Sequence, residues 1–207
     1  MIELRVYTER DERIFLEHLE KAFLDIEGKD NFYKITLPRF SNPSTRGHLI
    51  VASLDNQIAG FGGYEQVCNN QFIRENLEGA LGWIGQDQRI LLEYMKRARD
   101  DLGKGEATAT IYDNDLTKIN PSLNENDFYC SISLVLPEFR RRGIGLALVN
   151  ERIKRARRES ATAIYTECWE YGNASKMYTK AGFSPILRAG PRYNDGSAQM
   201  LMGLILQ

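Results

Sequence analysis

The chain has 207 residues, of which 43% are hydrophobic, and this is enough to bury a sizeable core. Its 27 basic and 28 acidic residues nearly cancel, so the net charge provides no long-range attraction for nucleic acid or an anionic membrane. The segment Met1–Arg13 is charged and lacks the apolar core of a signal peptide, and no run is apolar and long enough to span a bilayer. We therefore expect a cytoplasmic protein.

The start of the chain predicts a strand followed by a helix. Ile2, Leu4 and Val6 alternate with polar residues, which is the period of a half-buried strand. Asp11 is expected to cap a helix whose apolar residues recur at helical spacing until Gly28 ends the pattern.

A hairpin is predicted next. Two strands, 48–54 and 58–64, are joined by a turn at Asp55 and Asn56. Several glycines lie in the second strand, which indicates that another group approaches the backbone closely there. These glycines are Gly60, Gly62 and Gly63.

The middle of the chain has the weakest pattern. A helix is expected over 86–102, and the Asn- and Asp-rich stretch 112–127 indicates an exposed loop. Residues 1–207 are therefore expected to form a single domain.

Strands and helices alternate clearly again in the last part of the chain. Apolar and β-branched residues over 128–136, ending at Pro137, predict a central strand, and a helix over 143–158 follows. The further expected elements are a strand over 163–169, a helix over 174–181 closed by Gly182, and a terminal strand over 200–206. The apolar terminal strand could be buried or could pair with a second copy, so a homodimer stays open.

Three cysteines, Cys68, Cys130 and Cys168, lie far apart in the sequence. They lack the spacing and the nearby histidines of a zinc site, so we expect buried thiols and no metal.

The segment Pro137–Gly145, between a strand and a helix, carries the strongest functional signal. A helix start presents free backbone N–H groups to one point, which suits a phosphate. Gly143 and Gly145 let a pyrophosphate approach the main chain, and the neighbouring arginines neutralise its charge. A dinucleotide fingerprint is disfavoured because Leu148 stands where it needs a third small residue. A nucleoside-triphosphate loop is disfavoured because it needs a Gly-Lys-Ser/Thr sequence here.

The sequence Arg140-Arg141-Arg142-Gly143-Ile144-Gly145 resembles the Gln/Arg-x-x-Gly-x-Gly/Ala signature of the GCN5-related N-acetyltransferases (GNAT). A second segment, Asn173–Phe183, resembles the closing helix of this family, with its Ala, Tyr, Lys and Gly-Phe. In many members the asparagine stands two places earlier, where this chain has Tyr171. The resemblance extends from about 128 to 183. The preceding stretch is longer than in a minimal member of the family, which implies an insertion at about 69–126. It implies an α/β (α+β) fold with a mixed, largely antiparallel sheet of about six or seven strands flanked by helices.

The resemblance also implies an enzyme that transfers acetyl from acetyl-coenzyme A (acetyl-CoA) to a primary amine of a small molecule or a peptide, without a metal. The Val135 N–H would stabilise negative charge on the thioester oxygen, and Tyr178, with a reference pKa of about 10, would protonate the departing thiolate. The implied cofactor-binding residues are Leu134, Val135, Leu136, Arg140, Arg141, Arg142, Gly143, Ile144, Gly145, Leu146 and Asn173.

Several alternatives stay open. Glu65 and Glu167 are both candidates for the general base, although each is more typical of a surface charge, and Asn173 could equally cap its helix. The chain could be a non-catalytic, CoA-binding regulatory module. The arginines at 140–142 and the basic helix could instead bind nucleic acid, but the balanced charge argues against this and against a membrane partner. The basic residues Arg152, Lys154, Arg155, Arg157 and Arg158 are expected on one solvated face of the helix.

Overall fold

The computed structural model describes residues 1–27, 32–41, 48–82, 108–112, 123–190 and 197–206. They form two compact units. The first unit contains residues 1–65 and 130–155, and the second contains residues 66–129 and 156–207. Each unit is described by itself.

The first unit contains strands β1 (Ile2–Val6), β2 (Leu49–Leu54), β3 (Gln57–Gln66) and most of β5 (Phe128–Val135), in the order β1-β2-β3-β5. The pairings of β1 with β2 and of β2 with β3 are antiparallel. The predicted turn between β2 and β3 is confirmed, because Asp55 and Asn56 have φ values of 52° and 62°. Two positive φ angles give a turn whose twist matches that of the flanking strands.

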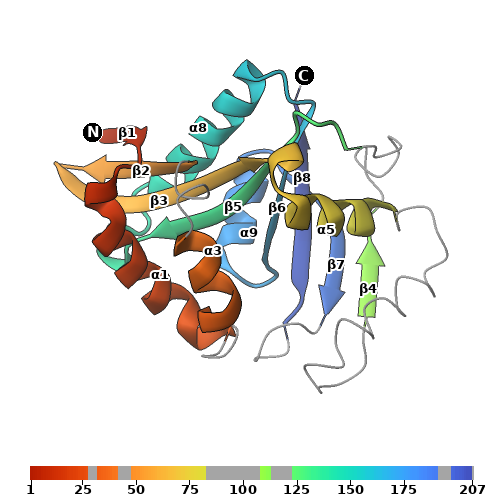
Figure 1. The fold of residues 1–207 in the computed structure, drawn as a ribbon, viewed down its shortest axis with the longest axis horizontal. Helices are drawn as coiled ribbons and strands as arrows, with labels where there is room; N and C mark the ends of the chain where they lie inside the picture. Colours follow the sequence, from red (N-terminus) through yellow and green to blue (C-terminus); the bar gives the residue numbers. More distant parts are fainter. Residues whose placement is uncertain (28–31, 42–47, 83–107, 113–122, 191–196, 207) are drawn as a thin grey trace. The chain divides into compact units, whose positions relative to one another are not determined.

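Helices cover both faces of these strands (Figure 1). Helices α1 (Glu12–Glu27) and α3 (Leu37–Ser41) lie on one face, and α8 (Ile144–Arg158) lies on the other. The alternation along β2 explains this, because Leu49 and Val51 belong to one apolar cluster and Ile50 and Ala52 to the other.

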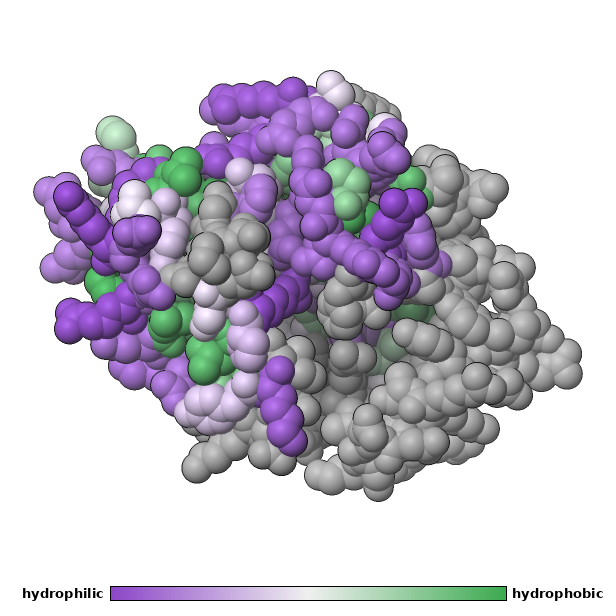
Figure 2. Space-filling model, viewed as in Figure 1, coloured by the Kyte–Doolittle hydropathy of each residue, from purple (hydrophilic) through white to green (hydrophobic). Residues whose placement is uncertain are grey.

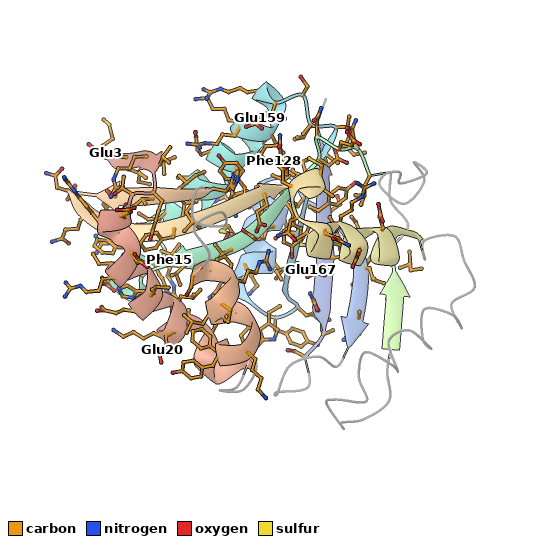
Figure 3. The ribbon with its side chains drawn as sticks, viewed as in Figure 1. Glu3, Phe15, Glu20, Phe128, Glu159 and Glu167 are labelled. Atoms are coloured by element: carbon orange, nitrogen blue, oxygen red, sulfur yellow. The ribbon has the colours of Figure 1, made fainter. Side chains whose placement is uncertain are left out.

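The cluster under α1 holds large aromatic side chains. Phe15 projects from α1 toward the strands in Figure 3 and is fully buried. Its ring lies edge-on to Phe40 and Phe61, with ring centroids 6.0 and 5.2 Å away. Such edge-to-face contacts add to the stabilisation from burial. They fix α1 and α3 on this face of the first unit.

The expectation of a half-buried first strand was wrong. Leu4 is 36% exposed and Val6 is 51% exposed, although the bounds of β1 agree with the prediction. β1 is the outer strand in the order of this unit, so only one of its edges is paired. Alternation in the sequence therefore identified the strand but not its burial.

The second unit contains strands β6 (Ala163–Trp169), β8 (Gln199–Ile205), β7 (Ser184–Gly190) and β4 (Thr108–Ile111), in that order. Its neighbouring strands pair antiparallel. Two helices belong to this unit, α5 (Gln71–Gly82) and α9 (Asn173–Lys180). Ile73 and Leu77 of α5 are buried in one cluster with residues of β6, β7 and β8.

The described residues contain eight strands, where about six or seven were expected. The strands at 163–169 and at the end of the chain are confirmed to within a residue. The helix expected over 86–102 lies outside the described residues. Among the described helices, none combines the length and the apolar character that crossing a membrane requires. The expectation of three buried thiols was wrong for Cys68, which is exposed, and correct for Cys130 and Cys168.

Asp11 is part of a buried ion pair ahead of α1. Its carboxylate is 2% exposed and accepts two hydrogen bonds from Arg5, at 2.7 and 2.6 Å, and one from the Thr8 N–H at 2.8 Å. Burial alone would raise the pKa of Asp11, but the bonds from Arg5 and Thr8 together with the Arg5 charge hold this pKa below its ordinary value.

A pH dependence of stability follows from this ion pair. A carboxyl group whose pKa is lower in the folded state stabilises the fold above its unfolded pKa, about 3.9, and loses this effect as the pH falls through its folded pKa. Asp11→Asn should cost about 1 kcal/mol at neutral pH, and its melting temperature should converge with that of the wild type below about pH 4. Thermal melts of both proteins between neutral and acid pH measure this, and a constant difference would contradict it.

Candidate functional site

The turn between β5 and α8 places a helix start beside the end of a strand. Phe139 N–H donates to Leu136 O at 2.9 Å and closes a tight turn over Pro137–Phe139. The chain then bends through two residues of positive φ, Arg141 at 62° and Gly143 at 82°. The strain of a positive φ at an arginine indicates that the surrounding structure fixes this turn.

The start of α8 has the features of an anion site. Ala147 N–H donates to Gly143 O at 3.0 Å and closes the first helical turn, so the amides of Ile144, Gly145 and Leu146 lie before it. A Cβ built on Gly143 would have no atom within 4 Å, so the space beside this backbone is open. Helix N-termini carry a partial positive charge. The backbone here therefore fits a phosphate.

Three exposed arginines precede this helix start. Arg140 Nε donates to Val135 O at 3.3 Å, and the guanidinium carbon of Arg142 lies 5.7 Å from the centre of the Phe139 ring. Phe139 itself is 8% exposed and anchors the turn in the core. The positive charges are thus held at the helix start while their side chains remain accessible to a phosphate.

The predicted cofactor residues fall into two sets. Leu134–Leu136 and Arg140–Leu146 belong to the first unit, where residues 136–143, including the short turn at Pro137–Phe139, connect the strand to the helix. Asn173 and Tyr178 belong to the second unit. The structure therefore brings the members of the first set together.

At the end of β5, the backbone N–H and C=O of one residue point away from the neighbouring strand β3. Leu136 N–H donates to Ala59 O of β3 at 3.0 Å. Because backbone polar groups alternate along a strand, the N–H and C=O of Val135 point to the other side of β5. Val135 is thus the residue of Leu134–Leu136 whose amide faces away from β3, as an oxyanion donor to a bound thioester requires.

The close approach predicted at the glycines of β3 is confirmed, and the approaching group is β5. A Cβ on Gly60 would lie 2.6 Å from Leu134 O and 3.3 Å from Val135 Cα. A Cβ on Gly63 would lie 2.5 Å from Ser131 Oγ. Real Cβ atoms essentially never lie closer than 3.0 Å to another atom, as these would to Leu134 O and Ser131 Oγ, so the glycines let β3 lie against β5 before the turn.

Tyr178 lies on α9, near its C-terminal end. Its side chain is 2% exposed, and its ring centroid is 5.0 Å from that of Phe183. Phe183 N–H donates to Tyr178 O at 3.0 Å across Gly182, whose φ is 96°. The C-cap residue of α9 is Ala181, one place before the predicted Gly182, and Gly182 follows it in the left-handed conformation that ends the helix.

Asn173 does not cap α9. Gly172 occupies the N-cap position, and Asn173 is the first residue of the helix and is exposed. Ser175 Oγ, one turn further on, donates to Gly172 O at 2.9 Å. The proposed contact of Asn173 with the cofactor stays a prediction.

The two candidate bases differ in burial. The interpretation of Glu65 as a surface charge was wrong, because this side chain at the end of β3 is 6% exposed and accepts a bond of 2.9 Å from Arg39 Nη2. Arg39 lies on α3, which the sequence analysis did not identify. Glu167 of β6 is exposed, and its carboxylate accepts a bond of 3.2 Å from the Tyr129 hydroxyl.

The expectation of one solvated basic face on α8 was wrong for Arg152. This arginine is fully buried, whereas Lys154, Arg157 and Arg158 are exposed. Hydrophilic side chains cover the end of α8 in the space-filling view (Figure 2). A sequence signal for Arg152 did exist, since it continues the spacing of the buried residues Ile144 and Leu148 by four. Within the part of the chain that the structure describes, no group of three or more His, Cys, Asp or Glu side chains could hold a metal ion.

Comparisons with known proteins agree with this geometry. Residues 91–183 match the model of the acetyltransferase (GNAT) family. The fold is similar to that of the ribosomal-protein-S18-alanine N-acetyltransferase from Escherichia coli, with a TM-score of 0.59 at 12% identity, over 100% of this chain and 95% of that one. A search by sequence among curated proteins returned no match.

Two further solved structures have the same fold. The N-acetyltransferase from Staphylococcus aureus Mu50 has a TM-score of 0.58 at 12% identity, over 100% of this chain and 99% of that one. The yncA protein from Salmonella typhimurium, solved with its cofactor acetyl-CoA, has a TM-score of 0.55 at 14% identity, over 100% of this chain and 94% of that one. The predicted mixed, largely antiparallel fold with flanking helices is confirmed.

Proposed function

Because residues 91–183 match the model of the acetyltransferase (GNAT) family, we propose that the chain transfers the acetyl group of acetyl-CoA to a primary amine of a small molecule or a peptide. The observation that carries this proposal is the start of α8, where open backbone amides and exposed arginines follow a turn of positive φ. The two units act together as a single domain with an insertion at about 69–126. The family match supports this, since residues 91–183 include parts of both units.

Acetyl-CoA supplies an activated thioester, and the chain has to bind its charge and orient its carbonyl. The amides of Arg141–Leu146 bind the pyrophosphate, and Arg140, Arg141 and Arg142 neutralise it. The N–H of Val135 points away from β3 and donates to the thioester oxygen as negative charge develops there. Leu134 and Leu136 line the same strand end, where the pantetheine arm lies along β5.

Proton transfer completes the reaction. The amine attacks only as a neutral base, so Glu65, Glu167 or a water held by one of them takes its proton. Tyr178 donates a proton to the thiolate of CoA as it leaves, which lowers the barrier because a phenol and a thiol have comparable pKa values. Asn173, at the start of the same helix as Tyr178, contacts the cofactor.

The acceptor is the least determined part of the proposal. The Escherichia coli protein of similar fold is named as an N-acetyltransferase of alanine in ribosomal protein S18. This supports including peptides with an N-terminal alanine in an acceptor screen beside small amines. Release of free CoA thiol reports turnover with either class.

The role of the arginines can be tested by reversing one charge. Arg142→Glu should raise the Kd for acetyl-CoA about tenfold or more, because it replaces a charge-assisted bond with repulsion of the pyrophosphate. Calorimetric titration measures this Kd. Arg158→Glu is the matched control, since it makes the same charge change at the exposed far end of the same helix.

Two outcomes would argue against the proposal. Equal loss of affinity in both variants would mean that the overall field, and not the turn, attracts the cofactor. A folded wild-type protein that does not bind acetyl-CoA would refute the proposed function. Saturable binding without thiol release from any amine would favour the alternative of a non-catalytic, CoA-binding regulatory module.

A further inference from the structure

Arg152, in the third turn of α8, is the largest fully buried side chain among the described residues. Its guanidinium donates hydrogen bonds in several directions. Nη1 donates to Gly63 O at 3.2 Å and to Ile132 O at 2.9 Å, Nη2 to Ser133 Oγ at 2.7 Å, and Nε to Leu148 O at 3.2 Å. One side chain thus joins α8 to both β3 and β5.

Packing alone does not explain an arginine at this position. Ile144 and Leu148, which precede Arg152 on the same face of α8, are apolar and fully or almost fully buried. An apolar residue would continue this contact without the cost of removing a charge from water. A Cβ on Gly62 would lie 3.3 Å from Leu148 Cβ and 3.5 Å from Arg152 Nε, so α8 packs closely over β3 at this glycine and the guanidinium lies in van der Waals range of it.

The hydrogen bonds of Arg152 lie close to both parts of the proposed donor site in the first unit, which are the Val135 amide and the start of α8. Ser133 precedes Val135 by two residues, which is about 7 Å along a strand. Arg152 follows the start of α8 by eight residues, which is about 12 Å along the helix axis. The side chain therefore fixes α8 to β5 behind the anion site and next to the oxyanion donor.

This placement matters because acetyl-CoA has to contact both places at once. Its pyrophosphate binds at the start of α8 while its thioester lies at Val135. Apolar contacts between Leu136, Ile144 and Leu148 hold the helix against the strand but have no directional preference that would prevent sliding. The hydrogen bonds of the guanidinium are directional, because its N–H donors lie in one rigid plane.

We propose that Arg152 is a positioning residue for acetyl-CoA, which holds the start of α8 at a fixed distance and orientation from the Val135 amide. The inference rests on the proposed function, since it concerns the donor site of that reaction. Arg152 acts through the backbone of α8 and β5 and does not itself contact the cofactor.

Arg152→Lys tests this role most directly. Lysine keeps the positive charge and an apolar stem, but its single ammonium cannot reach acceptors on β3, β5 and α8 together. We expect the KM for acetyl-CoA to rise about tenfold and kcat at saturating substrates to fall about tenfold, because displacement of a binding group by a fraction of an ångström is costly. Ser133→Ala, which removes the acceptor of the Nη2 bond and leaves the other bonds of Arg152 in place, should change both in the same direction by about threefold.

A matched control separates positioning from loss of stability. Asp127→Asn perturbs a buried, hydrogen-bonded carboxylate in the second unit and should lower the melting temperature while KM and kcat stay within about twofold of the wild type. If Arg152→Lys lowers the melting temperature but leaves KM and kcat unchanged, Arg152 is only structural and the inference is wrong. Should Arg152→Lys fail to fold, unchanged kinetics in Ser133→Ala would lead to the same conclusion.

Hydrogen exchange provides a readout that needs no turnover. In the ligand-free Ser133→Ala protein, the amides of Val135 and of Ile144–Leu146 should exchange faster than in the wild type, with no change in the second unit. If these amides exchange at the same rate in the Ser133→Ala protein and in the wild type, the inference is wrong even if the enzyme is active. If the wild type does not bind acetyl-CoA, the proposed function fails, and the exchange result still decides whether Arg152 holds the helix start.

Discussion

Replacing Tyr178 by phenylalanine is expected to lower kcat about 100-fold and to leave the Kd for acetyl-CoA within about twofold. The Tyr178 side chain is 2% exposed and packs against Phe183, and a phenylalanine ring preserves both features. The change removes the hydroxyl group that we propose as the proton donor to the departing thiolate. Steady-state kinetics with thiol detection gives kcat, and calorimetry gives the Kd.

The control for this variant is Tyr165→Phe. Tyr165 belongs to the same unit, is 5% exposed, and also carries a hydroxyl in a protein interior. Burial and then the charge of Asp127 raise the pKa of Tyr165, so its phenol stays neutral as a general acid must before it donates. Loss of this hydroxyl should leave kcat unchanged. If Tyr178→Phe also retains full kcat, the proton comes from another group and the acid role of Tyr178 is refuted.

The segment of the donor site was predictable because its signals are local. The sequence from β5 through the turn to α8 carries an apolar strand, a proline that ends it, two glycines and a helical repeat within thirty-one residues, 128–158. Each of these acts on its own backbone or on near neighbours. The end of α9 at Gly182 was predictable for the same reason, since the positive φ there depends on the residue itself.

Strand β7 was not predicted because its sequence conflicts with its environment. Pro185 argues against a strand, yet the pairing of β7 with β8 shifts register between Pro185 and Leu187 and accommodates the proline there. Helix α5 was missed because Ile73 and Leu77 give only a narrow apolar stripe. The register shift that accommodates Pro185 and the packing that buries the narrow stripe of α5 both depend on other segments, so neither can be recognised from the sequence of the segment itself.

The sequence analysis also failed to predict which charged side chains are buried. Glu65 and Arg152 both appear as surface residues in the sequence, because Glu and Arg are rarely buried without partners. Their partners come from far along the chain: Arg39 is 26 positions from Glu65, and Gly63 is 89 positions from Arg152. The helical spacing places Arg152 on the buried face of α8, but the partners that make burial of its charge tolerable come from these distant segments, which one segment alone does not reveal.

Asp127→Ala is expected to lower the free energy of unfolding by about 3 kcal/mol or more. Asp127 is 1% exposed, and its Oδ1 accepts bonds from Thr162 N–H at 3.1 Å, from the Thr162 hydroxyl at 2.8 Å and from Ala163 N–H at 2.9 Å. Its Oδ2 accepts from Asn124 N–H at 3.0 Å. Alanine would leave these donors without the carboxylate that they share at the start of β6.

Denaturant unfolding compares this variant with two others. Asp127→Asn keeps one acceptor oxygen and should cost less than Asp127→Ala, and Thr162→Val removes only the hydroxyl donor and should cost about 1 kcal/mol. This ranking follows from counting the donors that each change leaves unsatisfied. A loss below 1 kcal/mol for Asp127→Ala would mean that water or another acceptor replaces the carboxylate, and the start of β6 would then be held by its apolar contacts alone.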